Sequence, residues 1–368
     1  MTGTLENRNK DKLKSDRFFE LDLIRSIATV FILLFHFNIC AQTNGVAYDH
    51  LYIHIGRNLY LGQQGVALFF ILSGCTSTLS FQSILQRTDS YKKAVLEYYG
   101  KRLLAVLPLY WCAYFIAFLL LRAPGGDVFS LRYLFTLTGL DGFLSVHGIV
   151  TPYLVGEWFV GAVLILYLLF PFIFMCIKKS PKCTAFLLAF LYLLLNKYYP
   201  FSFDREIDPI LRLPEFCIGI YLTGLFHKRK KEWLVAVPSL VIFIICILVL
   251  LKIDTMYIIL FQGVSLFLIL SSFGRMCQKG NNYLVRVLRW VITAFAGISY
   301  GVFLVHHFIM EWIIPSYTNM VWTNSVWIRL FIYAFVLSVI LAILLRYAAN
   351  SLIGIIKKFV EEQRYSDR

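Results

Sequence analysis

The first apolar stretch of the chain contains Arg25 and His36, which are residue types that bind anions and move protons. Eleven steps of 100° make three turns plus about 20°, so both residues share one helix face, about 16 Å apart along the axis. Arg25 alone fits snorkelling to the inner interface. His36 alone fits a packed, hydrogen-bonded side chain. Their shared face makes the pair a stronger functional candidate than either residue alone.

Other polar residues fall inside apolar stretches at depths near His36. Glu157, Glu215 and His306 are expected in the same outer half of the membrane, and Ser73 is expected near mid-depth. A carboxylate beside a histidine fixes its tautomer and raises its basicity. We therefore expect these side chains to converge on one buried polar site around His36. The alternative is that they form separate hydrogen bonds between helices.

Cationic residues gather at the opposite end of the same helices. Arg25, Lys101, Arg102 and Arg275 are expected to surround an entrance from the cytoplasm. A ligand with a phosphorylated head and a long uncharged tail would fit this gradient. Coenzyme A thioesters have that shape. The simpler interpretation of the basic clusters is membrane topology and attraction to anionic lipid.

The elements that must position these residues are membrane-spanning helices. Of the 368 residues, 59% are apolar and 15% are charged, whereas a soluble domain carries about 25% charged residues. This composition excludes a soluble, a disordered or a nucleic-acid-binding protein. We predict an all-α, polytopic integral membrane protein with about ten transmembrane helices. The expected spans are Leu21–Cys40, Gly62–Leu85, Leu103–Leu121, Leu154–Ile177, Cys183–Leu195, Pro209–Phe226, Trp233–Leu251, Thr255–Phe273, Trp290–Ile314 and Val326–Leu345.

The distribution of positive charge gives the expected orientation. Most of the 35 Lys and Arg residues fall in alternate connecting segments, which predicts that both termini are cytoplasmic. Residues 1–19 are then a cytoplasmic tail, residues 20–348 the membrane domain and residues 349–368 a basic cytoplasmic tail.

Segments 90–101 and 131–137 are expected to be short surface helices. The first span is expected to be an uncleaved anchor. The eight scattered cysteines indicate no metal site.

Six segments, in order, resemble motifs of the integral-membrane acyltransferase-three family. They are FFELDLIRSIATVFILLFHF with Arg25 and His36, GQQGVALFFILSG with Ser73 and Gly74, KRLLAVLPLYW with Arg102, Pro108 and Trp111, GEWFVGAVLILYLLFP with Trp158, RLPEFCIGIYLTG with Arg212, Pro214, Glu215 and Gly219, and ISYGVFLVH with Ser299, Tyr300 and His306. The resemblance covers nearly the whole chain. One departure is Ala105, where members often carry a second arginine. If both arginines normally hold the phosphates of the donor, either Lys101 or Arg275 substitutes here or the donor is bound differently.

The resemblance implies a multi-pass O-acyltransferase of the bacterial cytoplasmic membrane. Such an enzyme moves an acyl group, most often acetyl, from cytoplasmic acyl-CoA to a hydroxyl of an extracytoplasmic or lipid-linked glycan, such as a cell-surface polysaccharide. Acyl-CoA is then the donor substrate, no cofactor is bound, and membrane lipid surrounds the protein.

The residue roles follow as a hypothesis. Arg25, with Lys101 and Arg102, would hold the phosphates of the donor. His36 would be the general base, oriented by Glu157 or Glu215, or would carry the acyl group transiently. The residues left to shape the acceptor pocket are Ser73, Trp158, Tyr300 and His306. Two rivals remain: a proton-coupled transporter, and a polysaccharide flippase or exporter on the same scaffold.

Overall fold

The computed structural model describes residues 18–46, 60–121, 133–148, 155–201, 204–226, 231–248 and 253–366, and over these ranges the chain is helical, as predicted. Six helices are long and apolar enough to cross a membrane, or up to seven if one bent pair counts as a single span. The count of ten spans therefore stays a prediction. The six are α2 (Phe19–Thr43), α3 (Leu61–Leu85), α4 (Tyr91–Leu121), α7 (Glu157–Lys179), α11 (Thr255–Lys279) and α14 (Asn324–Ser366).

Shorter helices fill the remaining segments. Three of the expected spans are helices of 17, 16 and 14 residues, which at 1.5 Å per residue are about 21–26 Å long. These three are α8 (Pro181–Lys197), α10 (Trp233–Leu248) and α9 (Leu213–Phe226). The others are α5 (Tyr133–Thr138), α6 (Asp141–Val146), η2 (Arg205–Ile207) and η3 (Ile314–Tyr317).

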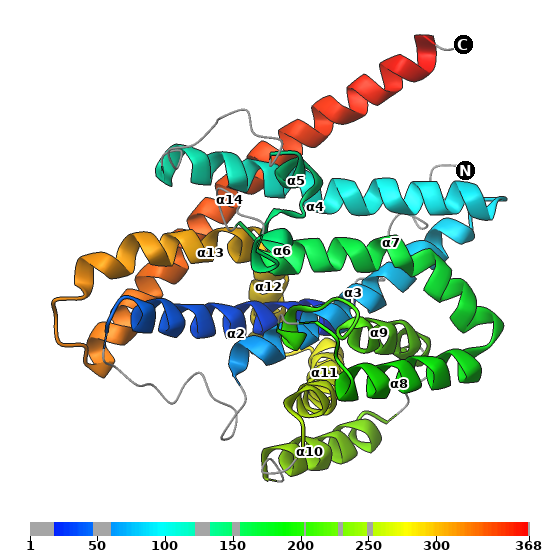
Figure 1. Ribbon diagram of the computed structural model, residues 1–368, viewed down its shortest axis with the longest axis horizontal. Helices are drawn as coiled ribbons and strands as arrows, with labels where there is room; N and C mark the ends of the chain where they lie inside the picture. Colours follow the sequence, from blue (N-terminus) through cyan, green and yellow to red (C-terminus); the bar gives the residue numbers. More distant parts are fainter. Residues whose placement is uncertain are drawn as a thin grey trace.

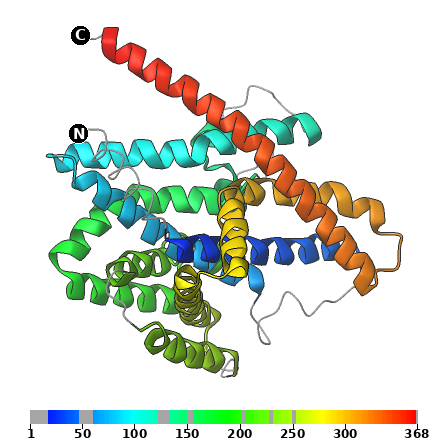
Figure 2. The same cartoon turned by 180° about the vertical axis from the view of Figure 1, so that it is seen from behind.

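The expected span over Trp290–Ile314 is instead two helices. α12 (Tyr283–Ala296) and α13 (Ser299–Ile313) meet at an angle of 63°. Figure 2 shows α12, in yellow, running across the direction of α2 and α13. The break falls at Gly297, where an added Cβ would lie 2.9 Å from the Arg346 guanidinium. Hydropathy is continuous through this bend, so composition alone gave no sign of it.

A second difference concerns α4. The expected surface helix over 90–101 and the expected span over 103–121 form one continuous helix of 31 residues, Tyr91–Leu121. Pro108 lies inside it. The start of α4 is held to α7 because the Tyr91 and Tyr99 hydroxyls donate to the carbonyl oxygens of Pro171 and Leu168. At the other end of the chain, α14 continues to Ser366, through most of the segment expected to be a tail.

The centre of the fold is a close crossing of α3 and α9 beside α2 (Figure 1). A Cβ added to Gly74 would lie 1.9 Å from the Phe216 carbonyl oxygen, and one added to Gly219 would lie 2.1 Å from the Ile71 carbonyl oxygen. The two backbones are therefore in direct contact, and only glycine fits at either position. Gly74 and Gly219 belong to two of the motifs above, and here their role is packing.

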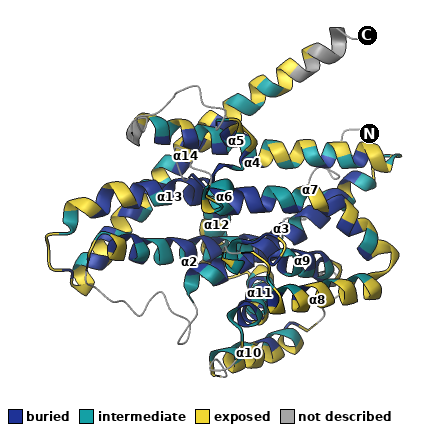
Figure 3. Cartoon of the chain, viewed as in Figure 1, coloured by how far each residue is buried: buried dark blue, intermediate teal, exposed yellow. Residues whose placement is uncertain are grey.

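The buried residues gather on α2, α3, α9 and α13, whereas α8 and α10 expose much of their surface (Figure 3). The exposed side chains of these two helices are largely apolar, for example Phe186, Leu187 and Leu248. A soluble protein rarely exposes large contiguous apolar surfaces. These faces are suited to contact with lipid.

Candidate active site around His36

Three histidine rings meet where α2 and α13 pack together. The centroid of the His36 ring lies 5.2 Å from that of His306 and 5.4 Å from that of His307, and both pairs are edge to face. The His306 Nδ1 lies 2.6 Å from the Phe303 carbonyl oxygen. Since a carbonyl only accepts, Nδ1 of His306 carries the proton and Nε2 is the acceptor nitrogen. The expected meeting of His36 and His306 is thus found, and His307 joins them.

His36 lines a cavity of about 120 Å³ between α2, α3, α7 and η2. Aromatic and polar side chains share its wall, which is the composition expected of a site for a small polar molecule. Trp158, on the first turn of α7, is among them, as expected from the sequence. The remaining residues that matter for chemistry are Gln63 from α3, Asp204 and Glu206 from the η2 segment, and Arg212 immediately before α9.

Glu206 is held in place by the start of α3. The Gln63 side-chain amide donates to both oxygens of the Glu206 carboxylate, at 2.7 and 2.8 Å, while its own oxygen accepts from the Tyr60 backbone N–H at 3.0 Å. Burial raises the pKa of the Glu206 carboxyl, and the hydrogen bond from Gln63 opposes this rise. A carboxylate in a fixed position therefore lines the same cavity as His36.

Glu215 has a different partner from the one expected. Its Oε1 lies 2.8 Å from Nη1 of Arg212, and the two side chains are only 3% and 1% exposed. The Arg212 Nε donates to the Glu206 carbonyl oxygen at 2.7 Å. Glu215 does not line the His36 cavity, whereas Arg212 does. The arrangement makes Glu215 a positioning residue: it holds Arg212, which holds the backbone of the segment that carries Glu206.

Two further residues were expected near His36. Glu157 is the first residue of α7, but its side chain lies outside the described part of the structure. Ser73 is buried in α3 next to the glycine crossing. It is seven residues beyond Val66, the last α3 residue on the cavity wall, which is about 10 Å of helix rise.

The expected donor end lies near the start of α2. Arg25 is partly exposed, and its Nη1 lies 3.8 Å from the Asp22 carboxylate. Arg102 faces the interior, with its guanidinium 5.4 Å from the Tyr98 ring centroid and 5.0 Å from that of Tyr167. Lys101, its neighbour, is half exposed and pairs with Glu97 at 3.3 Å. Of the two adjacent cations in the motif, only Arg102 points inward.

A second cavity, of about 210 Å³, lies beside the break between α12 and α13. Its wall includes Tyr300, Ala105 and Arg346. The Tyr300 hydroxyl donates to the Val106 carbonyl oxygen at 3.3 Å. The two cations expected to compensate for Ala105 are each paired elsewhere: Lys101 with Glu97, and Arg275 with Glu232 at 3.1 Å.

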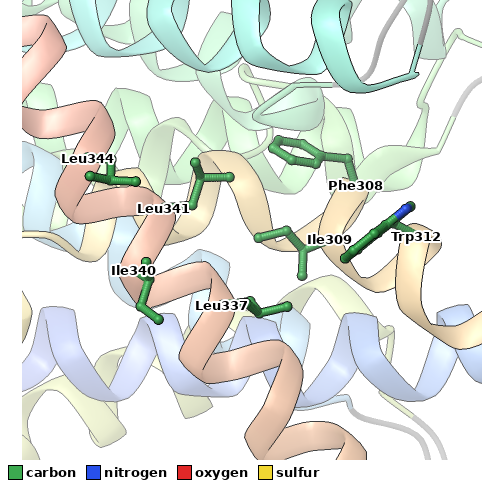
Figure 4. A pocket seen from close by; sticks show the side chains of 7 residues that line it. All are labelled: Phe308, Ile309, Trp312, Leu337, Ile340, Leu341 and Leu344. Atoms are coloured by element: carbon green, nitrogen blue, oxygen red, sulfur yellow. The ribbon is translucent and has the colours of Figure 1, made fainter.

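A wider apolar groove, of about 310 Å³, runs along the contact between α13 and α14 (Figure 4). Its wall consists of Phe308, Ile309, Trp312, Leu337, Ile340, Leu341 and Leu344. Phe308 and Trp312 project from α13 roughly opposite His306 and His307, at 100° per residue. The helix itself therefore separates the groove from the histidines. The groove offers contact with hydrocarbon but no polar chemistry.

Sequence reasoning missed Asp204 and Glu206 because they precede α9 in a polar connection, and no helical periodicity gives such residues a depth. The density of charge in the segment DREIDP was the available signal. Gln63 and Arg212 stood inside quoted motifs, but only the fold shows that both contact Glu206.

A family model described as an acyltransferase domain matches residues 18–347. The matched range begins one residue before α2 and ends within α14. It therefore includes all the residues of both cavities that are used in the arguments above. No curated protein matches the chain.

Proposed function

The chain belongs to the acyltransferase-domain family, and from this membership we propose that it is an O-acyltransferase of the bacterial cytoplasmic membrane. The donor is cytoplasmic acyl-CoA, most often acetyl-CoA. The acceptor is a hydroxyl of an extracytoplasmic or lipid-linked glycan. The concentration of Lys and Arg in alternate segments supports cytoplasmic termini and a multi-pass topology of about ten crossings.

The observation that carries the proposal is the position of His36 on the cavity wall, with Trp158, Glu206 and Arg212 on the same wall. An acyl transfer to a hydroxyl needs a base for the hydroxyl proton, a surface for the sugar and charge to orient both. The cavity supplies all three: the base is His36, the surface is Trp158, and the charged groups are Glu206 and Arg212. The indole of Trp158 offers an apolar face on which a sugar ring can stack.

The chemistry proceeds at the imidazole. His36 accepts the proton of the acceptor hydroxyl. The oxygen of that hydroxyl attacks the carbonyl carbon of the thioester at the same time. The C–O bond forms, the C–S bond breaks, and the proton passes from His36 to the coenzyme thiolate. A positioned base of this kind contributes about 10²- to 10⁴-fold to the rate. The alternative order, in which the imidazole first takes the acyl group, uses the same residue.

The donor is proposed to enter from the start of α2. Arg25, which lies 3.8 Å from the Asp22 carboxylate, and Arg102 are the cations proposed to hold its phosphates, and Lys101, which pairs with Glu97 on the exposed side, is a third candidate. The rise of about 16 Å between Arg25 and His36 suits a pantetheine arm. The small cavity at His36, about 120 Å³, favours a short acyl group such as acetyl over a long chain.

The test is transfer of label from [¹⁴C]acetyl-CoA to cell-surface glycan by membranes that contain the protein, compared with membranes that lack it. We expect label in base-labile glycan esters only when the protein is present. Succinyl-CoA and propionyl-CoA are compared in parallel to establish the acyl group. If no acyl-CoA donates label but a proton gradient drives solute uptake or glycan export, the enzyme proposal is wrong and a transporter or flippase takes its place.

A further inference from the structure

The charged side chains on the wall of the His36 cavity are few, and all come from the segment between α8 and α9. Most of the wall is apolar or aromatic. In the described part of the chain, its charged residues besides His36 are Asp204, Glu206 and Arg212. Charges beside an apolar wall are screened less than charges in water. The sign of these few groups therefore decides which ligands the cavity accepts.

The two arginines of this segment are both paired with carboxylates that do not line the cavity. Arg212 pairs with Glu215 at 2.8 Å, and both side chains are almost fully buried. Arg205, which stands between the two acidic residues in the sequence, directs its Nη1 to the Asp254 carboxylate at 2.7 Å and does not line the cavity. Each arginine is thus neutralised by its own partner. The described wall keeps the negative charge of its two carboxylates.

Glu206 is a hydrogen-bond acceptor in a fixed position. The Gln63 amide donates to both of its carboxylate oxygens, at 2.7 and 2.8 Å. Its backbone N–H donates to Asp204 Oδ1 at 2.9 Å, and its carbonyl oxygen accepts from the Arg212 Nε at 2.7 Å. A carboxylate offers about four lone-pair sites, of which the Gln63 amide uses two. The remaining sites suit the hydroxyl groups of a sugar, which are donors.

A sugar ring in this cavity would meet the indole of Trp158, the imidazole of His36 and the carboxylate of Glu206 on one wall. A neutral ring can stack on the indole and donate its hydroxyls to the carboxylate. A ring that carries its own carboxylate or phosphate would bring like charge to the wall. Juxtaposed like charges exclude a ligand effectively, and most of all where little water screens them.

We propose that the sugar acylated at His36 is uncharged, and that Glu206 selects it by accepting hydrogen bonds from its hydroxyls. Asp204, which is exposed and lines the same cavity, adds negative charge where the cavity meets solvent. This inference rests on the proposed function, because it takes the acceptor to be a glycan. It narrows the acceptor to sugars without a carboxylate or a phosphate, which excludes uronic acids and sugar phosphates.

The first measurement identifies the sugar that receives the acyl group. Membranes that contain the native protein are supplied with acetyl-CoA labelled with ¹³C in the acetyl group, or with the donor established above. The glycan is then fragmented in a tandem mass spectrometer, which locates the labelled ester on a particular sugar. We expect the ester on a neutral sugar. An ester on a uronic acid or a sugar phosphate would overturn this inference and leave the proposed function intact. If no labelled ester forms with any acyl-CoA, the proposed function itself fails.

The second measurement assigns the selection to Glu206, with isolated glycan as the acceptor and purified protein in phosphatidylcholine discs. E206Q keeps the shape of the side chain and removes its charge. We expect E206Q to raise the KM for the glycan about 10- to 100-fold, as loss of hydrogen bonds to a charged group does. The kcat should stay close to native, because binding is lost and the base is retained.

D254N is the matched control. It also removes one carboxylate charge from a side chain that contacts this segment, but Asp254 does not line the cavity. Asparagine can still cap α11 and accept from Arg205. D254N should therefore have the native KM. Unfolding midpoints of all three proteins are measured so that rates are compared per folded molecule.

Three kinetic results would remove Glu206 from acceptor selection while transfer by the native protein upholds the proposed function. If E206Q has the native KM, the carboxylate does not bind the sugar. If E206Q lowers kcat at an unchanged KM, the carboxylate acts in the chemistry and not in binding. If D254N raises the KM as much as E206Q does, the field of the whole segment selects the acceptor, and not a contact in the cavity.

Discussion

Replacing Glu215 by alanine would remove one partner of a buried ion pair. Arg212 and Glu215 are 1% and 3% exposed and 2.8 Å apart, so the pair is shielded from solvent. Breaking one side of such a pair typically costs about 3–5 kcal/mol, because the remaining charge stays buried without compensation. We expect E215A to lose stability in this range. We also expect it to lose transfer activity per folded molecule, because Arg212 anchors the backbone at Glu206.

The double variant R212M/E215L separates positioning from chemistry. Replacing both partners of a buried pair by apolar residues is often neutral or stabilising. The double variant should therefore be more stable than E215A, although it loses the bond from Arg212 to the Glu206 carbonyl and stays impaired in transfer. Stability is measured by denaturant unfolding in mild detergent, and transfer is measured per folded protein.

Two results would refute the reasoning about Glu215. If E215A is as stable as the native protein but inactive, the carboxylate takes part in the chemistry and is not a positioning group. If R212M/E215L is no more stable than E215A, the cost does not arise from an uncompensated buried charge.

The remaining predictions concern packing and pH. G219A should destabilise the protein by about 1–3 kcal/mol or more, because its Cβ would lie 2.1 Å from the Ile71 carbonyl oxygen, whereas G224A on the same helix has open space and should be neutral in the same unfolding assay. The raised pKa of Glu206 makes the folded state keep its proton at a pH where the unfolded chain has lost it. Stability should therefore fall as pH rises from the ordinary glutamate pKa of 4.5 through the raised value. E206Q should flatten this fall in unfolding midpoints measured from pH 4 to 7, and an unchanged slope would contradict the assignment.

The chain's strongly apolar segments made the helical class and the main elements predictable from sequence. The expected span Leu21–Cys40 lies within α2, and the shared face of Arg25 and His36 follows from regular helical geometry. The same reasoning expected His36 and His306 to converge, and their rings are 5.2 Å apart. Local periodicity was sufficient there because each residue sits in one uninterrupted helix.

What the sequence could not supply depends on contacts between distant segments. The break at Gly297 coincides with a hydrogen bond from Arg346 on α14, 49 positions away, and not with any fall in hydropathy. Glu206 reaches the His36 cavity because Gln63, 143 positions earlier, donates to it. Glu215 was expected beside His36 because hydropathy indicated its approximate depth in the membrane. Hydropathy does not indicate the direction in which a side chain points. The fold turns it to Arg212 instead.

The central claim is that His36 performs proton transfer in an acyltransferase site. The most direct measurement is transfer of label from [¹⁴C]acetyl-CoA to glycan by native protein, H36A and H147A at equal amounts of folded protein. His147 is a matched control because it does not line the His36 cavity and its ring contacts Phe143 instead. The account predicts that H36A loses at least about 10²-fold in rate while H147A keeps native activity. Transfer by H36A at the native rate would contradict the account and would leave His36 a packing residue of α2.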